Sequence, residues 1–476
     1  MNDHTAAIAA HFDQLAPNLD RWRRRNRTYY RDLEKLHRFW IPTGSRVLQV
    51  GSGLGDLLAA VEPSFGVGID VSPQAVAIAQ QRHPQLQFHC LAAEELTPEA
   101  IGNPEPFDAI ILTGVLSYLT DIQVVLEQLQ AFCHPRTRLI LGFHNFLWQP
   151  LLTAAEKVGQ RSPQPPESWL GMQDILNLLT LTGYEPIKQG RRFLLPRQIP
   201  LLTGWINRWI SPLPVIEHLA LTNYVIARPL AQPRSQPTVS VIVPARNEAG
   251  NISAAVERLP ELGAETELIF VEGHSRDQTW ETIEQTVAEY QGPLKLLACR
   301  QTGKGKADAV RLGFDKASGD ILMILDADLT VQPEDLGHFY RAIASGRGEF
   351  INGSRLVYPR SRLAMPGLNT LANRTFALIF SFLLGQPLKD TLCGTKVLWK
   401  TDYDRVAAGR KYFGDFDPFG DFDLLFGAAK LGLKIVEVPV RYQERSYGSS
   451  NIAHVREGLI LARMCLYAAG KLKFPH

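Results

Sequence analysis

Two aspartates separated by one residue, Asp326 and Asp328, come directly after the apolar run Ile321–Leu325. In an extended chain, residues i and i+2 point to the same side, so both carboxylates can face one point. Paired carboxylate oxygens suit Mg²⁺ or Mn²⁺, and such an ion can bridge the phosphates of a diphosphate. The pattern therefore predicts a metal site that also meets a diphosphate group.

Polar clusters also follow two earlier apolar runs of the same half of the chain, 239–243 and 268–271. Ligands bind beyond the carboxyl ends of the strands in open α/β sheets. We therefore expect all three clusters to lie together at one edge of a sheet. The residues of the two earlier clusters are Pro244, Asn247, Glu248, Glu272 and Asp277.

A different pattern lies nearer the N-terminus, where Gly51, Gly53 and Gly55 follow the apolar run Val47–Val50. Glycines permit positive φ in a turn and let the backbone approach a ligand closely. Asp70 ends a second apolar run about 20 residues further on, where an acid can accept both hydroxyls of a ribose. The nicotinamide fingerprint GxGxxG lacks its last glycine here. The pattern indicates a nucleoside-containing cofactor of another kind.

Together with two later blocks, residues ~40–150 resemble the core of class I S-adenosylmethionine-dependent methyltransferases. The block 107–116 is similar to the fourth strand of that family and its following turn, and Leu91–Glu94 is similar to its adenine-binding stretch. The resemblance implies that S-adenosyl-L-methionine is the cofactor. It also implies a cofactor site made of Gly51, Gly53, Gly55, Asp70 and Glu94.

Two positions depart from the family pattern, because Gln49 and Ala92 stand where acids are usual. Each loss removes a polar partner worth roughly 1–2 kcal/mol of cofactor binding. Two interpretations stay open: an active methyltransferase, and an inactive module that senses S-adenosyl-L-methionine or docks a partner. A nucleic-acid methyltransferase is a third, which the absence of an NPPY-like tetrad disfavours.

The methyl acceptor cannot be read from the sequence. The basic and aromatic segment Arg21–Tyr30 either closes over an anionic substrate or contacts lipid headgroups, or it forms a solvated helix face with packed tyrosines. His144 and Asn145 either line the acceptor site or are structural.

From ~238 to the C-terminus the chain resembles family 2 glycosyltransferases of the GT-A fold, particularly the branch that acts on polyprenyl (dolichol) phosphates. The resemblance implies a nucleotide-sugar donor, a GDP- or UDP-hexose, and an Mg²⁺ or Mn²⁺ held by Asp326 and Asp328. The donor site implied by the matching motifs consists of Pro244, Asn247, Glu248, Glu272, Asp277, Lys306, Asp326 and Arg355. The alternative interpretation of the segment around Lys306 is an ordinary solvated loop that does not contact the donor.

The same resemblance implies an acceptor side near the C-terminus. Asp423 stands where the branch carries an acceptor-side base, with Asp421 two residues away, and Arg445 matches an arginine that contacts phosphate. A carboxylate can take the acceptor's proton or orient an anionic phosphate, and one displacement without a protein nucleophile inverts the anomeric centre. Asn451 replaces a lysine that the family often has, which argues against a phosphate acceptor.

Two apolar stretches, Leu368–Leu384 and Leu459–Leu472, are shorter than the ~18–20 residues that cross a bilayer. They fit a membrane surface that presents a lipid phosphate, and they fit ordinary core packing equally well. On the membrane interpretation we expect Phe380 and Leu383, three residues apart, to share the lipid-facing side of a helix.

The 476 residues correspond to two or three domains at ~150 residues each. Apolar runs alternate with helical patterns on both sides of the proline-bearing segment 227–238, which predicts two parallel, doubly wound sheets. The predicted fold class is therefore α/β, with two Rossmann-like domains: a methyltransferase-like domain 1–230, a linker 231–237 and a glycosyltransferase domain 238–476.

The composition bears on the binding partners and the cellular compartment of the protein. A net charge of +2 gives no electrostatic argument for a nucleic-acid partner. Five scattered cysteines and the absence of an export signal favour a cytoplasmic protein, with peripheral contact at the inner face of the membrane. We expect a bifunctional enzyme, or a glycosyltransferase with an inactive N-terminal module. Its oligomeric state cannot be read.

Overall fold

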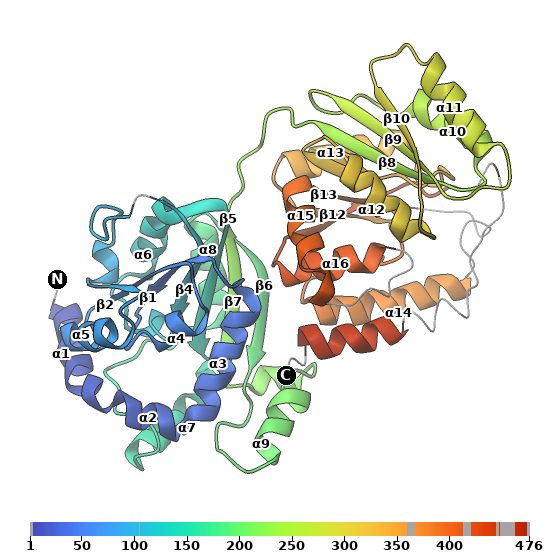
Figure 1. Ribbon diagram of the computed structural model, residues 1–476. Coiled ribbons are helices and arrows are strands. Elements are labelled where there is room, and N and C mark those ends of the chain that lie inside the picture. Colours follow the sequence, from blue (N-terminus) through green and yellow to red (C-terminus); the bar gives the residue numbers. More distant parts are fainter. Residues whose placement is uncertain are drawn as a thin grey trace. The chain divides into compact units, whose positions relative to one another are not determined.

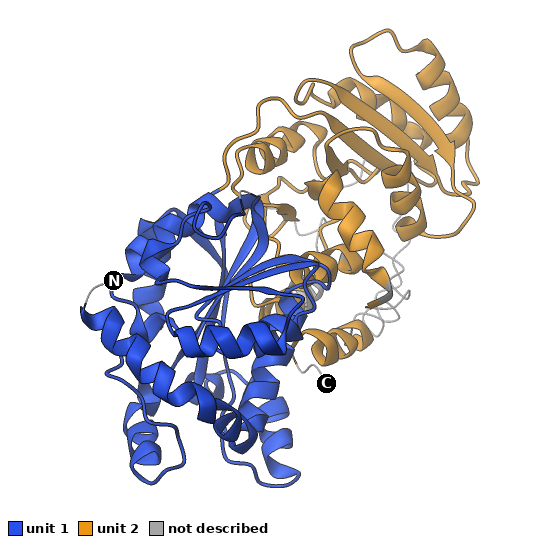
Figure 2. Cartoon of the chain, turned by 60° about the vertical axis from the view of Figure 1, so that its left-hand side comes forward, with its two compact units in different colours: residues 1–230 blue, residues 231–476 orange. Residues whose placement is uncertain are grey.

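The computed structural model describes residues 3–103, 105–358, 367–412, 420–443, 447 and 462–473. It divides into two compact units, residues 1–230 and 231–476 (Figure 2). Arg234, in the predicted linker, belongs to the second unit, where its guanidinium lies 4.1 Å from the centre of the Trp399 ring. Within the described part of the chain, no helix has the length and apolar character needed to cross a membrane.

The first unit is built on a seven-stranded sheet with the order β3-β2-β1-β4-β5-β7-β6 (Figure 1). Strands β1 to β5 are parallel, whereas β7 pairs antiparallel with both β5 and β6. The expected wholly parallel sheet is thus wrong at one edge, because β7 returns beside β5 after β6. The strands are Arg46–Val50 (β1), Phe65–Asp70 (β2), Gln87–Cys90 (β3), Phe107–Thr113 (β4), Cys133–His144 (β5), Tyr184–Arg192 (β6) and Thr222–Pro229 (β7).

Helices cover both faces of this sheet, so successive strand residues enter two separate cores. Val47 packs with Leu36 and Trp40 on one face, while Leu48 packs with Leu126 on the other. The α-helices are Asp3–Leu15 (α1), Leu19–Arg25 (α2), Arg27–Trp40 (α3), Asp56–Ala60 (α4), Pro73–Arg82 (α5), Ile122–Leu129 (α6), Gln149–Lys157 (α7), Met172–Leu181 (α8) and Leu202–Trp205 (α9).

The second unit has its own seven-stranded sheet, ordered β10-β9-β8-β11-β13-β12-β14. Strand β13 is antiparallel to β11 and β12, so this sheet is also mixed and not wholly parallel. The α/β class with two Rossmann-like units is nevertheless confirmed. The strands are Val239–Ala245 (β8), Thr266–Glu272 (β9), Lys295–Arg300 (β10), Ile321–Ile324 (β11), Phe350–Ser354 (β12), Lys396–Trp399 (β13) and Ile435–Pro439 (β14).

The helices of the second unit include the long α14, one of the two apolar stretches. Phe380 and Leu383 are buried, and the Phe380 ring lies 5.2 Å from those of Phe422 and Phe426 on α16. The expectation that Phe380 and Leu383 face lipid is therefore wrong, because both side chains are buried and α16 packs against Phe380. The α-helices are Ile252–Arg258 (α10), Thr279–Glu289 (α11), Lys306–Lys316 (α12), Leu336–Ala344 (α13), Gly367–Leu384 (α14), Lys400–Ala408 (α15) and Asp421–Lys430 (α16).

The opposite side of α14 exposes two large apolar residues together with Arg374 and Thr375. Leu378 is 74% exposed and Ile379 is 38% exposed. The segment 462–473 contacts α14 and exposes Leu466 and Tyr467. The two apolar stretches therefore combine core packing on one side with an exposed, partly apolar surface on the other.

Candidate active sites

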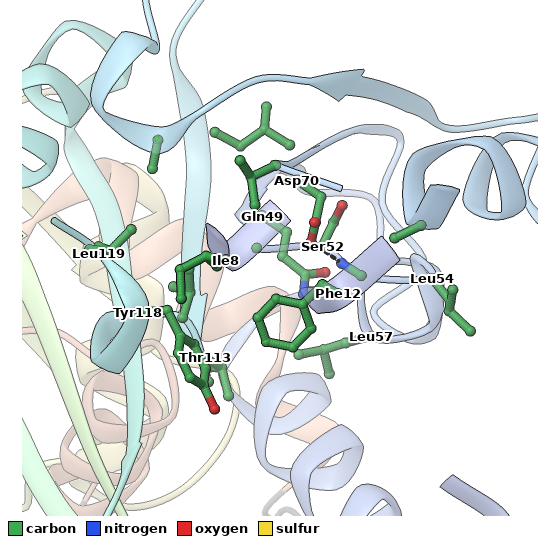
Figure 3. Close-up of a pocket in the computed structure, with 18 of the residues that line it drawn as sticks. Ile8, Phe12, Gln49, Ser52, Leu54, Leu57, Asp70, Thr113, Tyr118 and Leu119 are labelled. Atoms are coloured by element: carbon green, nitrogen blue, oxygen red, sulfur yellow. Dashed lines mark hydrogen bonds between the residues drawn. The ribbon is translucent and has the colours of Figure 1, made fainter. Parts of the chain in front are cut away.

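A cavity of about 260 Å³ lies at the carboxyl ends of β1, β2 and β4 in the first unit (Figure 3). The glycine turn after β1 forms one wall. Gly51 has a φ of +70°, and a Cβ atom there would lie 2.7 Å from the Val115 side chain. A larger residue would therefore both strain the turn and collide with the next loop. Of the predicted cofactor residues, Gly51, Gly53, Asp70 and Glu94 line the cavity.

Gly55, the third glycine of the predicted set, does not line the cavity. Its φ is +78°, and a Cβ atom there would lie 2.5 Å from the Phe88 ring. Gly55 precedes the first residue of α4, so it lets that helix start close to β3. Its contribution is to the shape of the turn.

Asp70 ends β2 and points into the cavity. Its Oδ2 accepts a hydrogen bond from Gly53 N at 2.7 Å, and its Oδ1 accepts one from Ser72 N at 3.0 Å. Burial raises the pKa of Asp70, while these backbone donors act in the opposite direction. The carboxylate thus fixes the glycine turn and keeps lone pairs on both oxygens for a ligand.

Two further polar groups face the cavity without a partner in the described structure. Gln49 Oε1 and Ser52 Oγ are both buried, and neither atom takes part in a hydrogen bond. Such groups cost free energy unless a ligand or water satisfies them. Figure 3 shows both beside Asp70. The amide oxygen of Gln49 can accept a hydrogen bond from an ammonium group, so replacing the usual acid with Gln keeps the acceptor and loses the charge.

Glu94 lies at the other side of the cavity and is partly committed to the protein. Its Oε1 accepts a hydrogen bond from Thr120 N at 2.8 Å. Ala92 lines the cavity beside it with a methyl group only. Of the two positions where the family usually has an acid, only position 49 therefore keeps a polar side chain, that of Gln49.

The sequence interpretation missed a wall of the cavity that comes from α1. Ile8 and Phe12, four residues apart, line the cavity, and the Phe12 ring lies 5.3 Å from that of Tyr118. Asp13 ties this helix to the start of α5, because its Oδ1 accepts hydrogen bonds from Ser72 Oγ at 2.5 Å and Gln74 N at 3.0 Å. The i, i+4 spacing of Ile8 and Phe12 is the sequence pattern that could have indicated an apolar helix face here.

The residues considered for the methyl acceptor have separate roles. Tyr30 lines the cavity, and the Arg23 guanidinium stacks over its ring at 4.6 Å. Tyr29 Oη lies 3.4 Å from His144 Nε2, and burial lowers the pKa of His144 to about 4. Asn145 donates hydrogen bonds to the carbonyl groups of His218 and Ala220, which is a structural role.

In the second unit, the loops after β8 and β9 are joined by hydrogen bonds. Asn247, with a φ of +57°, accepts from Arg276 N at 2.7 Å, and its own N–H donates to Ser275 Oγ at 3.0 Å. Pro244 lies within β8 itself. The buried Glu248 accepts from Asn251 Nδ2 at 2.7 Å. These motif residues therefore build one connected rim.

The two acids of the β9 loop take part in the same rim. Glu272 ends β9, is buried, and accepts from Ser275 N at 2.5 Å. Burial alone would raise the pKa of Asp277, but hydrogen bonds from Thr279 and from the Ala249 N–H lower it overall. Tyr447 Oη also lies 3.4 Å from Asp277 Oδ2.

Asp326 and Asp328 follow β11 as expected, and both are half-exposed while Ala327 between them is buried. Asp326 Oδ1 lies 2.6 Å from Lys306 Nζ at the start of α12. Burial by itself would raise the pKa of Asp326, but the charge and hydrogen bond of Lys306 lower it. A Cβ atom at Gly394 would collide with both side chains, so glycine permits this close approach. Asp328 Oδ1 accepts from Thr330 Oγ1 at 2.8 Å.

This pair fits a Mg²⁺ or Mn²⁺ ion that is held partly by its substrate. Among the described residues, no group of three or more His, Cys, Asp or Glu side chains could hold a metal ion. Two carboxylates with substrate phosphates and water are the usual ligand set of Mg²⁺ at such sites. Lys306 places one positive charge next to Asp326.

Arg355 is engaged with the protein. Its Nε and one terminal nitrogen donate to both oxygens of the fully buried Asp390, at 2.7 and 2.8 Å. Burial opposes the charge on each partner, but the guanidinium still lowers the pKa of Asp390 far below its ordinary value. This bidentate pair anchors the loop before β13, so Arg355 has fewer donors for a nucleotide than the motif suggested.

The predicted acceptor-side residues are only partly described. Asp423 on α16 is buried, and its Oδ2 accepts from Arg410 Nε at 2.7 Å and lies 3.3 Å from a terminal nitrogen of Arg311. Asp421 is the first residue of α16. Arg445 and Asn451 lie outside the described residues. The two arginine partners of Asp423 were not foreseen.

Comparisons with known proteins agree with this division of the chain. Residues 48–139 match the family model described as a methyltransferase domain, and residues 240–403 match the model of glycosyl transferase family 2. The two halves are thus a methyltransferase domain and a glycosyltransferase domain. The first unit is similar to methyltransferase domains over residues 48–139, and the second is similar to glycosyl transferase family 2 over residues 240–403.

Two curated relatives of the second unit are named as mannosyltransferases of polyprenyl phosphates. A dolichol-phosphate mannosyltransferase of Pyrococcus furiosus is 30% identical over 220 residues, 45% of this chain and 59% of that protein. An undecaprenyl-phosphate mannosyltransferase of Micrococcus luteus is 27% identical over 45% of this chain and 87% of its own length. This chain therefore spans less than two thirds of the first of these relatives.

Solved structures show similarity in both halves at low identity. Magnesium protoporphyrin IX methyltransferase of Synechocystis, with bound SAH, is 17% identical with a TM-score of 0.34, over 48% of this chain and 100% of that one. Glucosyl-3-phosphoglycerate synthase of Mycobacterium tuberculosis, with Mn²⁺ and UDP, is 18% identical with a TM-score of 0.37, over 50% of this chain and 81% of that one.

Proposed function

We propose that the second unit transfers a hexose from a GDP- or UDP-hexose to a polyprenyl phosphate or related glycolipid, with inversion at the anomeric carbon. The observation that supports this is the Asp326–Asp328 pair at the end of β11, next to the joined β8 and β9 loops, in a family 2 unit. The lipid phosphate follows the similarity to the dolichol-phosphate and undecaprenyl-phosphate mannosyltransferases.

The donor side follows from the charges at this edge of the sheet. Asp326 and Asp328 would hold Mg²⁺ or Mn²⁺, which when bound neutralises charge on the departing nucleoside diphosphate. Lys306 is held by Asp326 Oδ1 and directs its ammonium toward the same place, so it can also hold a phosphate oxygen. Glu272 and Asp277 belong to the rim where the nucleoside would lie, and their carboxylates can accept hydrogen bonds from it.

On the acceptor side, Asp423 does not need to remove a proton, and it holds two arginines that can orient the phosphate. A phosphate oxygen is already anionic at neutral pH and needs no strong base to attack the anomeric carbon. Arg410 and Arg311 hold Asp423 in place and bring positive charge near it, which favours an anionic acceptor. The exposed Leu378, Ile379, Leu466 and Tyr467 offer an apolar surface for the lipid-bearing membrane.

The experiment for the glycosyltransferase compares Asp328→Asn with wild type. Asn keeps an oxygen that accepts from Thr330 but loses the negative charge that holds the ion, so the fold should survive. We expect at least a ~100-fold loss of hexosyl transfer to a short polyprenyl phosphate in Mn²⁺ buffer, in line with the loss of several kcal/mol of charge stabilisation. Asp404→Asn, an exposed acid on α15, is the matched control and should transfer normally.

Wild-type turnover by Asp328→Asn would exclude the metal site, and a soluble alcohol glycosylated as fast as the lipid phosphate would exclude the lipid acceptor. The second outcome leaves the family 2 assignment intact.

For the first unit we propose binding of S-adenosyl-L-methionine and methyl transfer to an acceptor of unspecified class. Asp70 has a free lone pair on each oxygen for the two ribose hydroxyls, and Gln49 Oε1 and Ser52 Oγ are buried acceptors without partners. The bound cofactor supplies an electrophilic methyl group. Phe12, Tyr30 and Tyr118 line the cavity and can shield a bound cofactor from water.

The second candidate, a sensing or docking module without turnover, is favoured by the lost acid at Gln49 and by the methyl group at Ala92. Calorimetric titration of the whole chain with S-adenosyl-L-methionine decides whether the cofactor binds at all. Release of S-adenosyl-L-homocysteine during incubation with cell lipids and glycans then separates an enzyme from a sensor.

A further inference from the structure

The long connection between β6 and β7 exposes an unusual amount of apolar surface on the first unit. It runs from Phe193 to Leu221 and carries α9 and the following helical turns. Leu201 is 94% exposed, Trp205 55% and Trp209 41%. Monomeric soluble proteins rarely leave neighbouring large apolar side chains in water without a partner. We call Leu201, Leu202, Trp205, Trp209, Val215 and Leu219 the tryptophan patch; all six are exposed.

This segment presents its polar side chains to the protein and its apolar side chains to solvent. Thr203 is buried and accepts a hydrogen bond from Ile199 N at 2.8 Å, while Asn207 exchanges two hydrogen bonds with the backbone of Leu195. Leu202, Trp205 and Trp209 follow the i, i+3, i+7 spacing of one helix face. The hydrogen bonds of Thr203 and Asn207 fix the conformation of the segment, so the fold itself directs the apolar face outward.

A second exposed apolar cluster adjoins the patch. Trp148 Nε1 donates to the Leu219 carbonyl at 2.8 Å, and Asn145 donates to the carbonyl of His218. These bonds fasten the turn 146–148 against the end of the β6–β7 connection. Phe146 and Leu147 of that turn are 54% and 48% exposed. The apolar surface therefore extends from the β6–β7 connection onto the loop that follows β5.

The charge around the patch selects its partner. Residues 193–221, the connection that carries the patch, contain two arginines, Arg197 and Arg208, and one acid, Glu217, so the segment has a net charge of +1 with His218 neutral. The Arg208 guanidinium lies 4.9 Å from the centre of the Trp209 ring. Tryptophan side by side with arginine on an otherwise apolar helix face is the pattern of segments that lie in the headgroup region of anionic membranes.

We propose that the tryptophan patch is a membrane-docking surface of the first unit, and that its partner is an anionic lipid bilayer. The surface lies at the end of the sheet where β5 and β6 finish, which is also where the strands that bear the cofactor cavity finish. Docking there brings the cavity edge of the sheet toward the lipid. The proposal rests on residues of the first unit alone and does not depend on glycosyl transfer by the second.

The test uses the full-length chain with vesicles of phosphatidylcholine, with and without phosphatidylglycerol. We expect the wild-type protein to float with the anionic vesicles, and brominated lipids to quench its tryptophan fluorescence. Leu201→Asp with Trp205→Asp should weaken binding by about tenfold or more, because two inserted side chains are lost. Arg197→Ser should weaken it by about fivefold at low salt and less in 0.5 M salt.

The matched control is Leu181→Asp, since Leu181 is 62% exposed at the end of α8. It precedes β6, whereas the patch follows β6, so a strand of nine residues, about 30 Å long, separates the two sites. The control should bind vesicles like the wild type. Circular dichroism checks that both variants fold.

Three outcomes overturn the proposal. One is a wild-type chain that ignores anionic vesicles, and another is a double variant that binds them as well as the control does. The third is bromolipid quenching that is unchanged in Trp205→Phe/Trp209→Phe, which would put the contact elsewhere. If the wild type is a dimer that the double variant converts to a monomer, with vesicle binding unaltered, the patch pairs with a second copy instead.

Discussion

At the scale of single residues, Asp70 holds the glycine turn by accepting from Gly53 N, and on the proposed function it also accepts the ribose hydroxyls. Asp70→Ala removes the acceptor for Gly53 N and Ser72 N as well as two hydrogen bonds to the ligand. We expect the affinity for S-adenosyl-L-methionine to fall by roughly 2–4 kcal/mol. Calorimetric titration measures it.

The control for this change is Asp108→Ala. Asp108 is exposed and accepts from Arg46 N at 2.8 Å at the opposite end of the same sheet. It should leave the affinity unchanged, and hexosyl transfer should be normal in both variants. Unaltered cofactor affinity in Asp70→Ala would mean that the ribose lies elsewhere.

His37 makes the stability of the first unit depend on pH. Burial lowers the pKa of His37 to about 4, and its two ring nitrogens lie 2.8 Å from the Leu33 carbonyl and 2.9 Å from Thr113 Oγ1. The unfolded chain takes up a proton near the ordinary pKa of ~6.5, whereas the folded chain stays neutral down to about 4. Stability is therefore full above pH ~6.5 and is lost as the pH falls toward 4.

The expected slope from His37 is about 1.4 kcal/mol per pH unit within that window. Urea unfolding of the first unit at pH 7, 6 and 5 gives the slope for the wild type and for His37→Gln, which has no titrating ring. The variant should show a shallower loss of stability on acidification. Parallel curves for the two proteins would contradict the assignment of the proton to His37.

At the scale of elements, α14 illustrates how a shared helix face can be assigned to the wrong surroundings. Phe380→Asp buries a carboxylate against the Phe422 and Phe426 rings, so we expect more than ~3 kcal/mol of destabilisation of the second unit. Leu378→Asp changes a side chain that is 74% exposed and should cost less than ~0.5 kcal/mol. Thermal unfolding of the two variants makes the comparison. Equal melting temperatures would show that α16 does not cover Phe380 in solution.

Local patterns predicted much of the rest. The glycine turn after β1, the acids that end β2 and β9, and the Asp326–Asp328 pair all lie at or just after strand ends, because short apolar runs and the turns after them are local in sequence. What failed depends on distant residues. Spacing places Phe380 and Leu383 on one face, but only α16, some forty residues later, decides that the face is buried. The same holds for α1 across the cavity and for the arginines around Asp423.

At the scale of the whole molecule, two separate sheets with separate cores imply two separate unfolding units. We expect S-adenosyl-L-methionine to stabilise the first unit alone, and UDP or GDP with Mn²⁺ the second alone. A ligand at 100 times its dissociation constant adds about 2.7 kcal/mol, or roughly 5–10 °C for a unit of this size. Differential scanning calorimetry should resolve one transition that moves with each ligand. Asp70→Ala should abolish the first shift and keep the second, and Asp328→Asn should do the reverse. If either ligand moves both transitions equally, the units are coupled and a fusion of two independent sites is the wrong description.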